Sequence, residues 1–275
     1  MRKTQLEQLP VYVFSRFSGY PEIVHFSTTR NGGQSHGRYK TLNLGFNSGD
    51  EEYNVQANRE ILSNALDLKP GHLVFTVQTH SSRVAKITSE VLSWNDQTRR
   101  EKLNETDALI TNVPNICIAI KTADCIPVLL YDPQHKAMAA IHAGWRGTVG
   151  RIVAKTIDSM KQEYGTLPEN LIAGIGPGIG PDVYEVGPEV VEIVHQQLGK
   201  NHGLIQYYPQ KSDHQQSPHL DLWKANYVQL LETGLPEENI EIAELCTLSH
   251  PEEFYSARRD GAATGRMATG IMIRT

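Results

Sequence analysis

Thr122–Gly147 reads TADCIPVLLYDPQHKAMAAIHAGWRG, and this stretch decides both the fold and the site of the chain. It holds two apolar runs, Ile126–Tyr131 and Ala137–Ile141, on either side of the turn signal Asp132-Pro133. Apolar runs of this length around a proline turn predict a β-hairpin or two neighbouring strands. We therefore expect a strand pair near the middle of the chain, with its two outer ends side by side.

Chemically active side chains stand at those two ends. Cys125 comes directly before the first run and His142 directly after the second, so the turn brings a thiol and an imidazole together. Asp124 adds a carboxylate beside the thiol, and Arg146 adds a cation beyond the imidazole. A strand pair in a protein core needs none of these groups at its end, so the pattern favours a functional site.

The composition is that of an ordinary globular protein. The chain has 275 residues, of which 39% are hydrophobic and 21% charged, and its formal net charge is −5. A negative net charge argues against broad binding to nucleic acid, which needs a basic face, but it permits a small anion held by a few arginines. No apolar run approaches the length of a membrane span.

The N-terminus and the cysteines predict a cytoplasmic protein. The opening residues MRKTQLEQLPVYVF are too polar after their basic start to form a signal peptide. The cysteines Cys117, Cys125 and Cys246 are few and odd in number, which indicates reduced thiols rather than a disulfide framework. Cys117 lies inside an apolar run, so we expect it to be a small buried hydrophobe.

Strand-like and helical segments are mixed without a strict βαβ order, which favours a single α+β domain over residues 1–275. Amphipathic spacing and helix-stop signals predict helices at 55–66, 148–164, 188–198 and 222–232. We expect Gly165 to close the second helix in a left-handed conformation and Asp221 to cap the fourth. The polar segments 90–106 and 200–218 are predicted to be loops.

His80 follows the predicted strand 73–78 and is a third candidate for the site. With Cys125 and His142 it makes a set of two imidazoles and one thiolate, which suits tetrahedral Zn²⁺ with one open position. Copper accepts the same ligands. The alternative is a metal-free pair, as in a thiol hydrolase or deamidase, in which Cys125 attacks as a thiolate and His142 is its base. The metal site needs His80, whereas the pair does not.

Several arginines and one helix start are candidates for holding an anion. The helix predicted from Thr148 begins near Arg146, and its free backbone N–H groups and positive dipole end suit a phosphate. Arg258 and Arg259 lie in a glycine-flanked loop and form either a solvated turn or an anion clamp. Arg59 lies within the first predicted helix, where a solvated side chain is the usual explanation.

These motifs taken together resemble the YfiH-like family, long labelled multicopper polyphenol oxidase or laccase-like and now regarded as purine nucleoside phosphorylases. The resemblance follows the chain in order over nearly its whole length, and the pairing of DC with HAGWRG is its most specific part. The matching segments are STTR with GG at 27–33, LNLG at 42–45, QTH at 78–80, ADCIPV at 123–128, HAGWRG at 142–147, GPGIG at 176–180, DLW at 221–223, CT at 246–247, SARRD at 256–260 and TGR at 264–266.

The resemblance implies a fold, an activity and a ligand set. The implied fold is a four-layer α/β/β/α arrangement with mixed sheets. The implied activity is phosphorolysis of adenosine, inosine and methylthioadenosine, together with adenosine deamination, so the expected partners are a purine nucleoside and phosphate. The implied metal is Zn²⁺ on His80, Cys125 and His142, with copper in some members. Asp124, Cys125 and His142 are then the predicted catalytic residues.

Roles for the remaining candidates follow from what this reaction needs. Arg59 and Arg146, with the helix start near Thr148, are the candidates for phosphate, and Asn43 is the candidate for a ribose hydroxyl. Asp124 either carries a proton during deamination or orients a neighbouring ligand.

Two further functions stay open beside these. A copper-dependent polyphenol oxidase would hold several coppers, and the sequence lacks a His-x-His cluster for them. A binding module without activity would have no use for an open coordination position. A metal-dependent nucleoside enzyme is therefore the preferred hypothesis.

Overall fold

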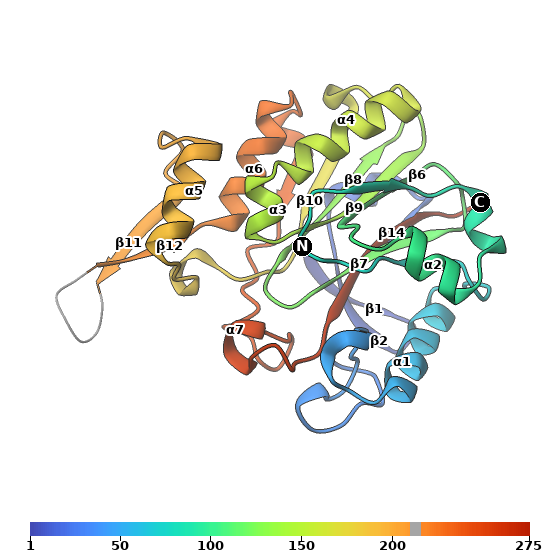
Figure 1. Cartoon of the computed structure of the whole chain (residues 1–275). Helices are drawn as coiled ribbons and strands as arrows, with labels where there is room; N and C mark the ends of the chain where they lie inside the picture. Colours follow the sequence, from blue (N-terminus) through green and yellow to red (C-terminus); the bar gives the residue numbers. More distant parts are fainter. Residues whose placement is uncertain (210–215) are drawn as a thin grey trace.

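Two six-stranded mixed sheets form the centre of the molecule (Figure 1), in a computed structural model that describes residues 1–209 and 216–275. From edge to edge, the first sheet contains β1 (Arg2–Leu6), β2 (Leu9–Val13), β3 (Ile23–Thr28), β14 (Met267–Ile273), β7 (Cys117–Thr122) and β4 (Leu73–Phe75). The second contains β13 (Ile240–Ile242), β10 (Ile172–Ile175), β8 (Ile126–Asp132), β9 (Ala137–Ala143), β6 (Ala108–Thr111) and β5 (Val84–Lys86). Most neighbouring strands are antiparallel, but β4–β7, β5–β6 and β10–β13 pair in parallel.

The helices of the described residues flank these sheets. They are α1 (Glu52–Ala65), α2 (Asp96–Lys102), α3 (Trp145–Val149), α4 (Ile152–Tyr164), α5 (Pro188–Leu198), α6 (Leu222–Glu232) and α7 (Ala257–Asp260). None of them is both long enough and apolar enough to cross a membrane.

The two sheets pack face to face, and their facing sides share one core. On β8, Leu129 and Tyr131 belong to this core, together with Ile118 of β7 and Ile271 of β14. Side chains alternate between the two faces of a strand, so the intervening Leu130 faces the other way. Each fully buried side chain of this kind contributes about 1.5–3 kcal/mol relative to an exposed one, and the shared core therefore holds the sheets together.

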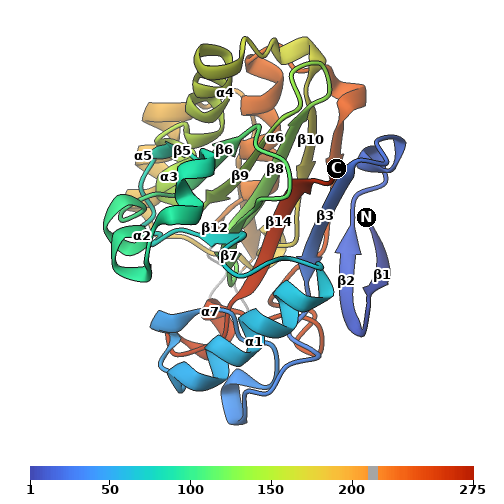
Figure 2. The ribbon, with the colours of Figure 1, turned by 90° about the vertical axis from the view of Figure 1, so that its right-hand side faces the viewer.

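Helices cover the outer face of each sheet. Leu130 packs in one cluster with Ile157 of α4 and Leu230 of α6, while Leu62 of α1 packs with Phe26 and with residues of β14 on the other sheet. Figure 2 shows α4 and α6 on one side of β8, β9 and β10, with β3 and β14 on the other. The order of layers is helices, sheet, sheet, helix, which confirms the α/β/β/α prediction.

The strand pair predicted around Asp132-Pro133 is confirmed. β8 and β9 are antiparallel neighbours, with Ile126 opposite Ala143 and Pro127 opposite His142. This register leaves Cys125 and His142 at the same end of the second sheet. The hairpin thus brings two of the predicted donors to one end of the sheet.

The predicted helices at 188–198 and 222–232 have the bounds of α5 and α6, and Asp221 caps α6 by accepting the backbone N–H of Lys224. The predicted helix at 148–164 is wrong at its start. The chain instead forms the short helix α3 and then α4, because Arg151 adopts a left-handed conformation with φ of 57°. Gly165 closes α4 with φ of 75°, as expected.

Two predicted loops contain regular structure. Residues 90–106 hold α2, whose start is capped by the Asn95 side chain accepting the N–H of Thr98. Residues 200–218 include β11 (Ile205–Pro209) and the start of β12 (Gln216–Leu220), which form a separate two-stranded sheet. Residues 210–215 of that predicted loop lie outside the described residues. Both segments are polar and show no clear apolar periodicity, so the sequence did not indicate the helix and strands that they contain.

Candidate active site

The structure brings the three predicted donors together. One donor atom of each of His80, Cys125 and His142 lies within 4.8 Å of the other two. The two imidazole rings have centroids 5.0 Å apart and an interplanar angle of 61°. His142 is buried, Cys125 is partly buried and His80 is exposed. The group is therefore enclosed on the protein side and accessible from the side of His80.

Local backbone geometry explains how the donors approach one another. His80 follows β4 with a φ of 62°, a left-handed conformation that costs a non-glycine residue of the order of 1 kcal/mol. Gly144 lies against both His80 and Cys125. A Cβ on Gly144 would be 2.8 Å from Cδ2 of His80 and 3.0 Å from Sγ of Cys125. The first glycine after HA in the HAGWRG motif is therefore needed to leave room for the donors.

A buried aspartate, Asp107, holds two of the donors in place. Its Oδ1 accepts a hydrogen bond from Nδ1 of His142 at 2.6 Å and from the backbone N–H of His80 at 3.1 Å. Its Oδ2 accepts the backbone N–H groups of Thr79 at 3.2 Å and Ser81 at 2.8 Å, and the Ser81 hydroxyl at 2.7 Å. Three successive amides thus surround one carboxylate, as in a backbone nest. Asp107 fixes the His80 turn and the orientation of the His142 ring at once.

Mutual contacts set the charges of this group. Burial raises the pKa of Cys125, but the charge of His142 and hydrogen bonds from both histidines outweigh burial and lower that pKa. Burial lowers the pKa of His142, but the Cys125 thiolate and Asp107 raise it overall. Burial also raises the pKa of Asp107, which His142 and Ser81 bring down to about 2. These contacts therefore favour a thiolate on Cys125 beside an imidazolium on His142.

These residues fit a divalent metal ion. Two imidazoles and a thiolate are ordinary zinc ligands, and copper accepts them too. The contacts of Cys125 favour its thiolate, which is the form that binds a metal, and Nδ1 of His142 donates a hydrogen bond to a carboxylate, as metal-binding histidines commonly do. Within residues 1–209 and 216–275, no further His, Cys, Asp or Glu joins the group. Three protein ligands are the pattern of a catalytic site, whereas a structural zinc usually has four.

A cavity of about 1310 Å³ opens from the donors and extends between β4, β7, α1 and α2. The predicted site residues that line it are Arg59, His80, Asp124, Cys125, His142, Arg146 and Arg258. Asn43, Thr148 and Arg259 are not part of its lining. The cavity therefore joins most, but not all, of the predicted site.

Asp124 lies beside the donors in a strained conformation. Its φ is 88°, and its side chain is largely buried. Oδ1 accepts the hydroxyl of Thr247 at 2.7 Å, and Oδ2 accepts the backbone N–H of Arg258 at 2.7 Å. These bonds tie the start of α7 to the site. Each carboxylate oxygen keeps a second lone pair, so this anchoring is compatible with a proton-transfer role.

Arg59 is held rigidly rather than solvated. Its Nε and Nη2 donate to the carbonyl oxygen of Leu44 at 3.1 and 2.9 Å. Its guanidinium carbon lies 4.1 Å from the ring centre of Phe46 and 4.5 Å from that of Phe75. Burial lowers the pKa of Arg59 to about 9, with a further lowering by Arg100. The usual explanation of a solvated helix arginine does not apply here.

Arg146 and the helix start behave differently. Arg146 is exposed at the cavity and stacks on the ring of Trp145, 4.4 Å from its centre. Thr148 is buried and lies within hydrogen-bonding distance of Asn226, away from the cavity. The expected helix start at Thr148 was wrong because α3 begins at Trp145, and with five residues it has no developed dipole.

Asn43 has a structural position. Its side chain is fully buried, its amide donates to Ser48 and Asp50, and its carbonyl accepts the N–H groups of Gly45 and Arg266. These contacts use the hydrogen-bonding groups of the side chain. Asn43 therefore fixes the loop under the cavity and is not available for a ribose hydroxyl.

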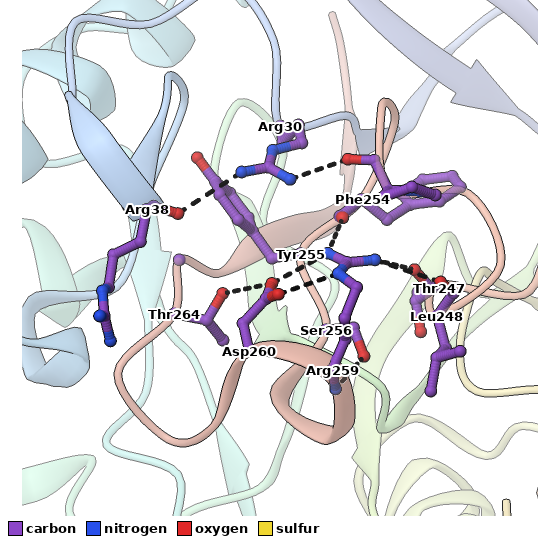
Figure 3. Close-up of polar contacts among 12 residues, drawn as sticks. Arg30, Arg38, Thr247, Leu248, Phe254, Tyr255, Ser256, Arg259, Asp260 and Thr264 are labelled. Carbon is purple, nitrogen blue, oxygen red and sulfur yellow. Dashed lines mark hydrogen bonds and ion pairs between the residues drawn. The ribbon is translucent and has the colours of Figure 1, made fainter.

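Arg259 is also structural, as Figure 3 shows. It makes two bonds to Asp260 at 2.9 Å and donates to the carbonyl oxygens of Thr247, Leu248 and Phe254. Its charge and N–H groups are satisfied inside the loop, which excludes the anion-clamp interpretation for this residue.

Sequence reasoning missed three polar residues of the site: Asp107, Lys121 and Arg266. Lys121 interrupts the apolar run of β7, and a lone charge in a central strand was a signal that a polar site lies there. Arg266 lies in the TGR segment, which only the family resemblance singled out, and Asp107 precedes β6 with no motif around it.

Comparison with known proteins places these observations in a family. The family model for multi-copper polyphenol oxidoreductase laccase matches residues 24–274. The chain is 44% identical over 260 residues to a purine nucleoside phosphorylase of Bacteroides thetaiotaomicron, covering 94% of this chain and 95% of that one. It is 37% identical over 248 residues to adenosine deaminase RL5 of an unknown prokaryotic organism, covering 90% and 92%.

A solved structure agrees with this match. The crystal structure of the Bacillus licheniformis hypothetical protein YfiH superposes with a TM-score of 0.88 at 30% sequence identity, covering 98% of each chain. The likeness includes both sheets and the covering helices, because nearly all of each chain is matched. The chain therefore belongs to the YfiH family, whose model carries the description of a multi-copper polyphenol oxidoreductase laccase.

Proposed function

We propose that this protein is a zinc-dependent purine nucleoside phosphorylase that acts on adenosine, inosine and methylthioadenosine and also deaminates adenosine. One observation carries the proposal: the three donors open onto a cavity that is also lined by half-buried cations, among them Arg59. A metal site and an anion site in one cavity suit a reaction between a nucleoside and phosphate. The names of the relatives from Bacteroides and of RL5 point to the same two reactions.

The chain's own residues divide the work of phosphorolysis. His80, Cys125 and His142 would hold the zinc, which supplies Lewis acidity when bound. Arg59 and Arg146 would bind and orient the phosphate beneath C1′ of the ribose. A phosphate oxygen forms the new bond to C1′ while the bond to the purine nitrogen breaks. The electron pair of the broken bond leaves with the purine, which takes up a proton from solvent.

Deamination of adenosine uses a different residue of the same cavity. Asp124 is the candidate for moving the proton between water and the leaving ammonia, because it lies beside Cys125 and lines the cavity. A carboxylate beside the zinc ligands has this role in other zinc deaminases.

The free thiols of the described residues also fit the predicted cytoplasmic location, which stays a prediction.

Product analysis tests the proposal. The zinc-loaded protein is incubated with adenosine, with inosine and with methylthioadenosine, each with and without phosphate. We expect free purine base together with ribose 1-phosphate, or its methylthio form, only when phosphate is present, and inosine from adenosine in both cases. A chelator should abolish both activities and added zinc should restore them. Release of base at an equal rate without phosphate would contradict phosphorolysis.

A metal-free thiol hydrolase is the second candidate. The Asp107–His142 bond of 2.6 Å beside the Cys125 thiolate is the geometry of a nucleophile, a base and an orienting carboxylate. His80 separates the two functions, because only the metal site needs its imidazole. Hydrolysis of an amide or thioester that survives both chelation and a His80→Ala change would favour the hydrolase.

The copper oxidase is tested in parallel by loading the protein with Cu²⁺ and measuring phenol oxidation.

A further inference from the structure

Three cations gather in the cavity on the side of β4 and α1. Arg59 comes from α1, Lys121 from β7, and Arg266 from the residue that precedes β14. All three line the same cavity as the donor group. Lys121 and Arg266 are brought together by the pairing of β7 with β14, in which Lys121 lies opposite Ala268. Remote segments of the chain thus place three positive charges around one space.

Backbone carbonyl groups, rather than carboxylates, fix these side chains. Arg59 donates to Leu44, Lys121 donates from Nζ to the carbonyl oxygen of Thr76 at 2.7 Å, and Arg266 donates to carbonyl oxygens in its own loop. The Nη1 group of Arg59 and the remaining hydrogens of the Lys121 ammonium have no acceptor among residues 1–209 and 216–275. The side chains are therefore fixed in position but keep donors to offer.

One aromatic ring connects two of the cations. The Phe75 ring lies 4.5 Å from the guanidinium carbon of Arg59 and 5.1 Å from Nζ of Lys121. Contacts of this kind are attractive and also desolvate the cation. Gly45 makes room for the third, because a Cβ on Gly45 would be 2.6 Å from Cγ of Arg266. The loop around Leu44 therefore positions both arginines.

The three cations of this cluster form no direct ion pair inside the described part of the chain. No carboxylate of that part lies within 4 Å of a charged nitrogen of Arg59, Lys121 or Arg266. Burial lowers the pKa of Lys121 well below its usual value, and the charges of Arg59 and Arg266 lower it further. Desolvated cations that repel one another are costly, and a bound anion would offset that cost.

We propose that Arg59, Lys121 and Arg266 form a binding subsite for a tetrahedral oxyanion, with phosphate as its ligand. The subsite adjoins the donor group, because both sets of side chains line the same cavity. Lys121 and Arg266 are therefore phosphate ligands in addition to Arg59, and the naming of phosphate rests on the proposed phosphorolysis. Free phosphate and the phosphoryl group of a nucleotide share this chemistry.

Direct binding tests the subsite apart from catalysis. Inorganic phosphate is titrated calorimetrically into the zinc-loaded protein, and adenosine 5′-monophosphate is titrated in a second series. The variants are Lys121→Met and Arg266→Met, and Lys161→Met on the exposed face of α4 is the matched control for a lost positive charge. We expect Lys121→Met to weaken phosphate binding about tenfold or more, as loss of a charge-assisted hydrogen bond does, and Lys161→Met to change nothing.

The outcomes separate the subsite from the proposed function. Weaker phosphate binding in Lys121→Met supports the subsite even when the wild type shows no phosphorolysis. Phosphorolysis by the wild type with the same phosphate affinity in Lys121→Met overturns the subsite and leaves the function standing. Binding of the nucleotide alone, weakened by the same variants, supports the subsite and assigns it to a nucleotide. Circular dichroism of each variant verifies folding. Lys121→Arg keeps the positive charge and should bind phosphate more tightly than Lys121→Met, which keeps the subsite testable if Arg266→Met fails to fold.

Discussion

The two ends of the cavity differ in how they handle charge. At the donor end, Asp107, His142 and Cys125 alternate in sign and balance one another through short contacts. At the cationic end, Arg59 and Lys121 share one aromatic ring and no carboxylate of the described residues pairs with them. A balanced set of ligands can hold a resident cation permanently. A cluster of cations without ion-pair partners suits an anionic ligand, which is the role that we propose for phosphate.

Removing a donor should have the largest effect. His142→Ala takes away one ligand and leaves Asp107 buried without its partner. We expect metal affinity to fall by more than about a hundredfold, since changes in the groups around a metal already cost 10–100-fold. Metal analysis after dialysis against a weak chelator measures this loss. Full metal content with normal activity would show that the group is not the metal site.

Changing Asp107 should weaken metal binding at the donor end and leave the cationic end of the cavity unaffected. Asp107→Asn keeps the shape but removes the charge that orients His142, so metal affinity should fall about 10–100-fold. The folded-state pKa of about 2 lies below the unfolded value, so the carboxylate stabilises the metal-free protein above about pH 4. That contribution is lost as the pH falls toward 2.

The stability of Asp107→Asn at pH 7 should therefore be lower by about 2 kcal/mol, measured by urea unfolding of the metal-free protein. Ser82→Ala, at a partly buried hydroxyl outside the nest, is a suitable control. Unchanged metal affinity in Asp107→Asn would contradict its positioning role.

Lys121→Met should change stability in the opposite direction. Burial lowers the folded-state pKa of Lys121, the charges of Arg59 and Arg266 lower it further, and Asp107 raises it. Its charge therefore costs stability below the folded pKa, and the cost disappears as the pH rises toward the unfolded value. In phosphate-free buffer near pH 7 we expect the melting temperature to rise by about 2–4 °C, equivalent to about 1 kcal/mol. A fall in melting temperature at neutral pH would show that the lysine stabilises the fold.

Asp124→Asn tests which reaction uses the carboxylate beside Cys125. We expect a lower rate of adenosine deamination, because an amide cannot carry the proton. We expect the metal content to be retained, because the amide keeps part of the bonding to Thr247 and Arg258. The ratio of inosine to adenine formed in phosphate buffer measures the effect. A parallel loss of metal would instead assign Asp124 to the support of the donors.

The smallest effect is expected from Gly45→Ala. Its Cβ would collide with the stem of Arg266 and shift that side chain by a few tenths of an ångström or more. We expect a several-fold rise in the Michaelis constant for phosphate, with the constant for the nucleoside unchanged. An equal rise in both constants would indicate a general disturbance of the loop.

The same contrast explains what could be predicted from the sequence. Cys125 and His142 were predictable because a two-strand hairpin joins them, and the register of β8 and β9 follows from local patterns. The cationic cluster was not, because Arg59, Lys121 and Arg266 meet only through the pairing of β7 with β14 and the packing of α1. Non-local contacts of this kind leave no periodic signal.

Two differences between the expectations and the structure have equally local causes. Asn43 in the LNLG segment was expected to meet substrate, but four polar neighbours that only the folded loop assembles occupy its side chain. The helix expected from Thr148 is broken because Arg151 takes a left-handed conformation. The residue type arginine does not predict that conformation.

The most direct test measures how the rate of nucleoside cleavage depends on phosphate concentration. It compares the metal-saturated wild type with Asp107→Asn and Lys121→Met, and asks whether the donor end and the cationic end of the cavity have separate roles. We predict that Lys121→Met raises the Michaelis constant for phosphate about tenfold while Asp107→Asn leaves it unchanged. Equal constants in all three proteins, or equal shifts in both variants, would contradict the division of the cavity into a metal end and an oxyanion end.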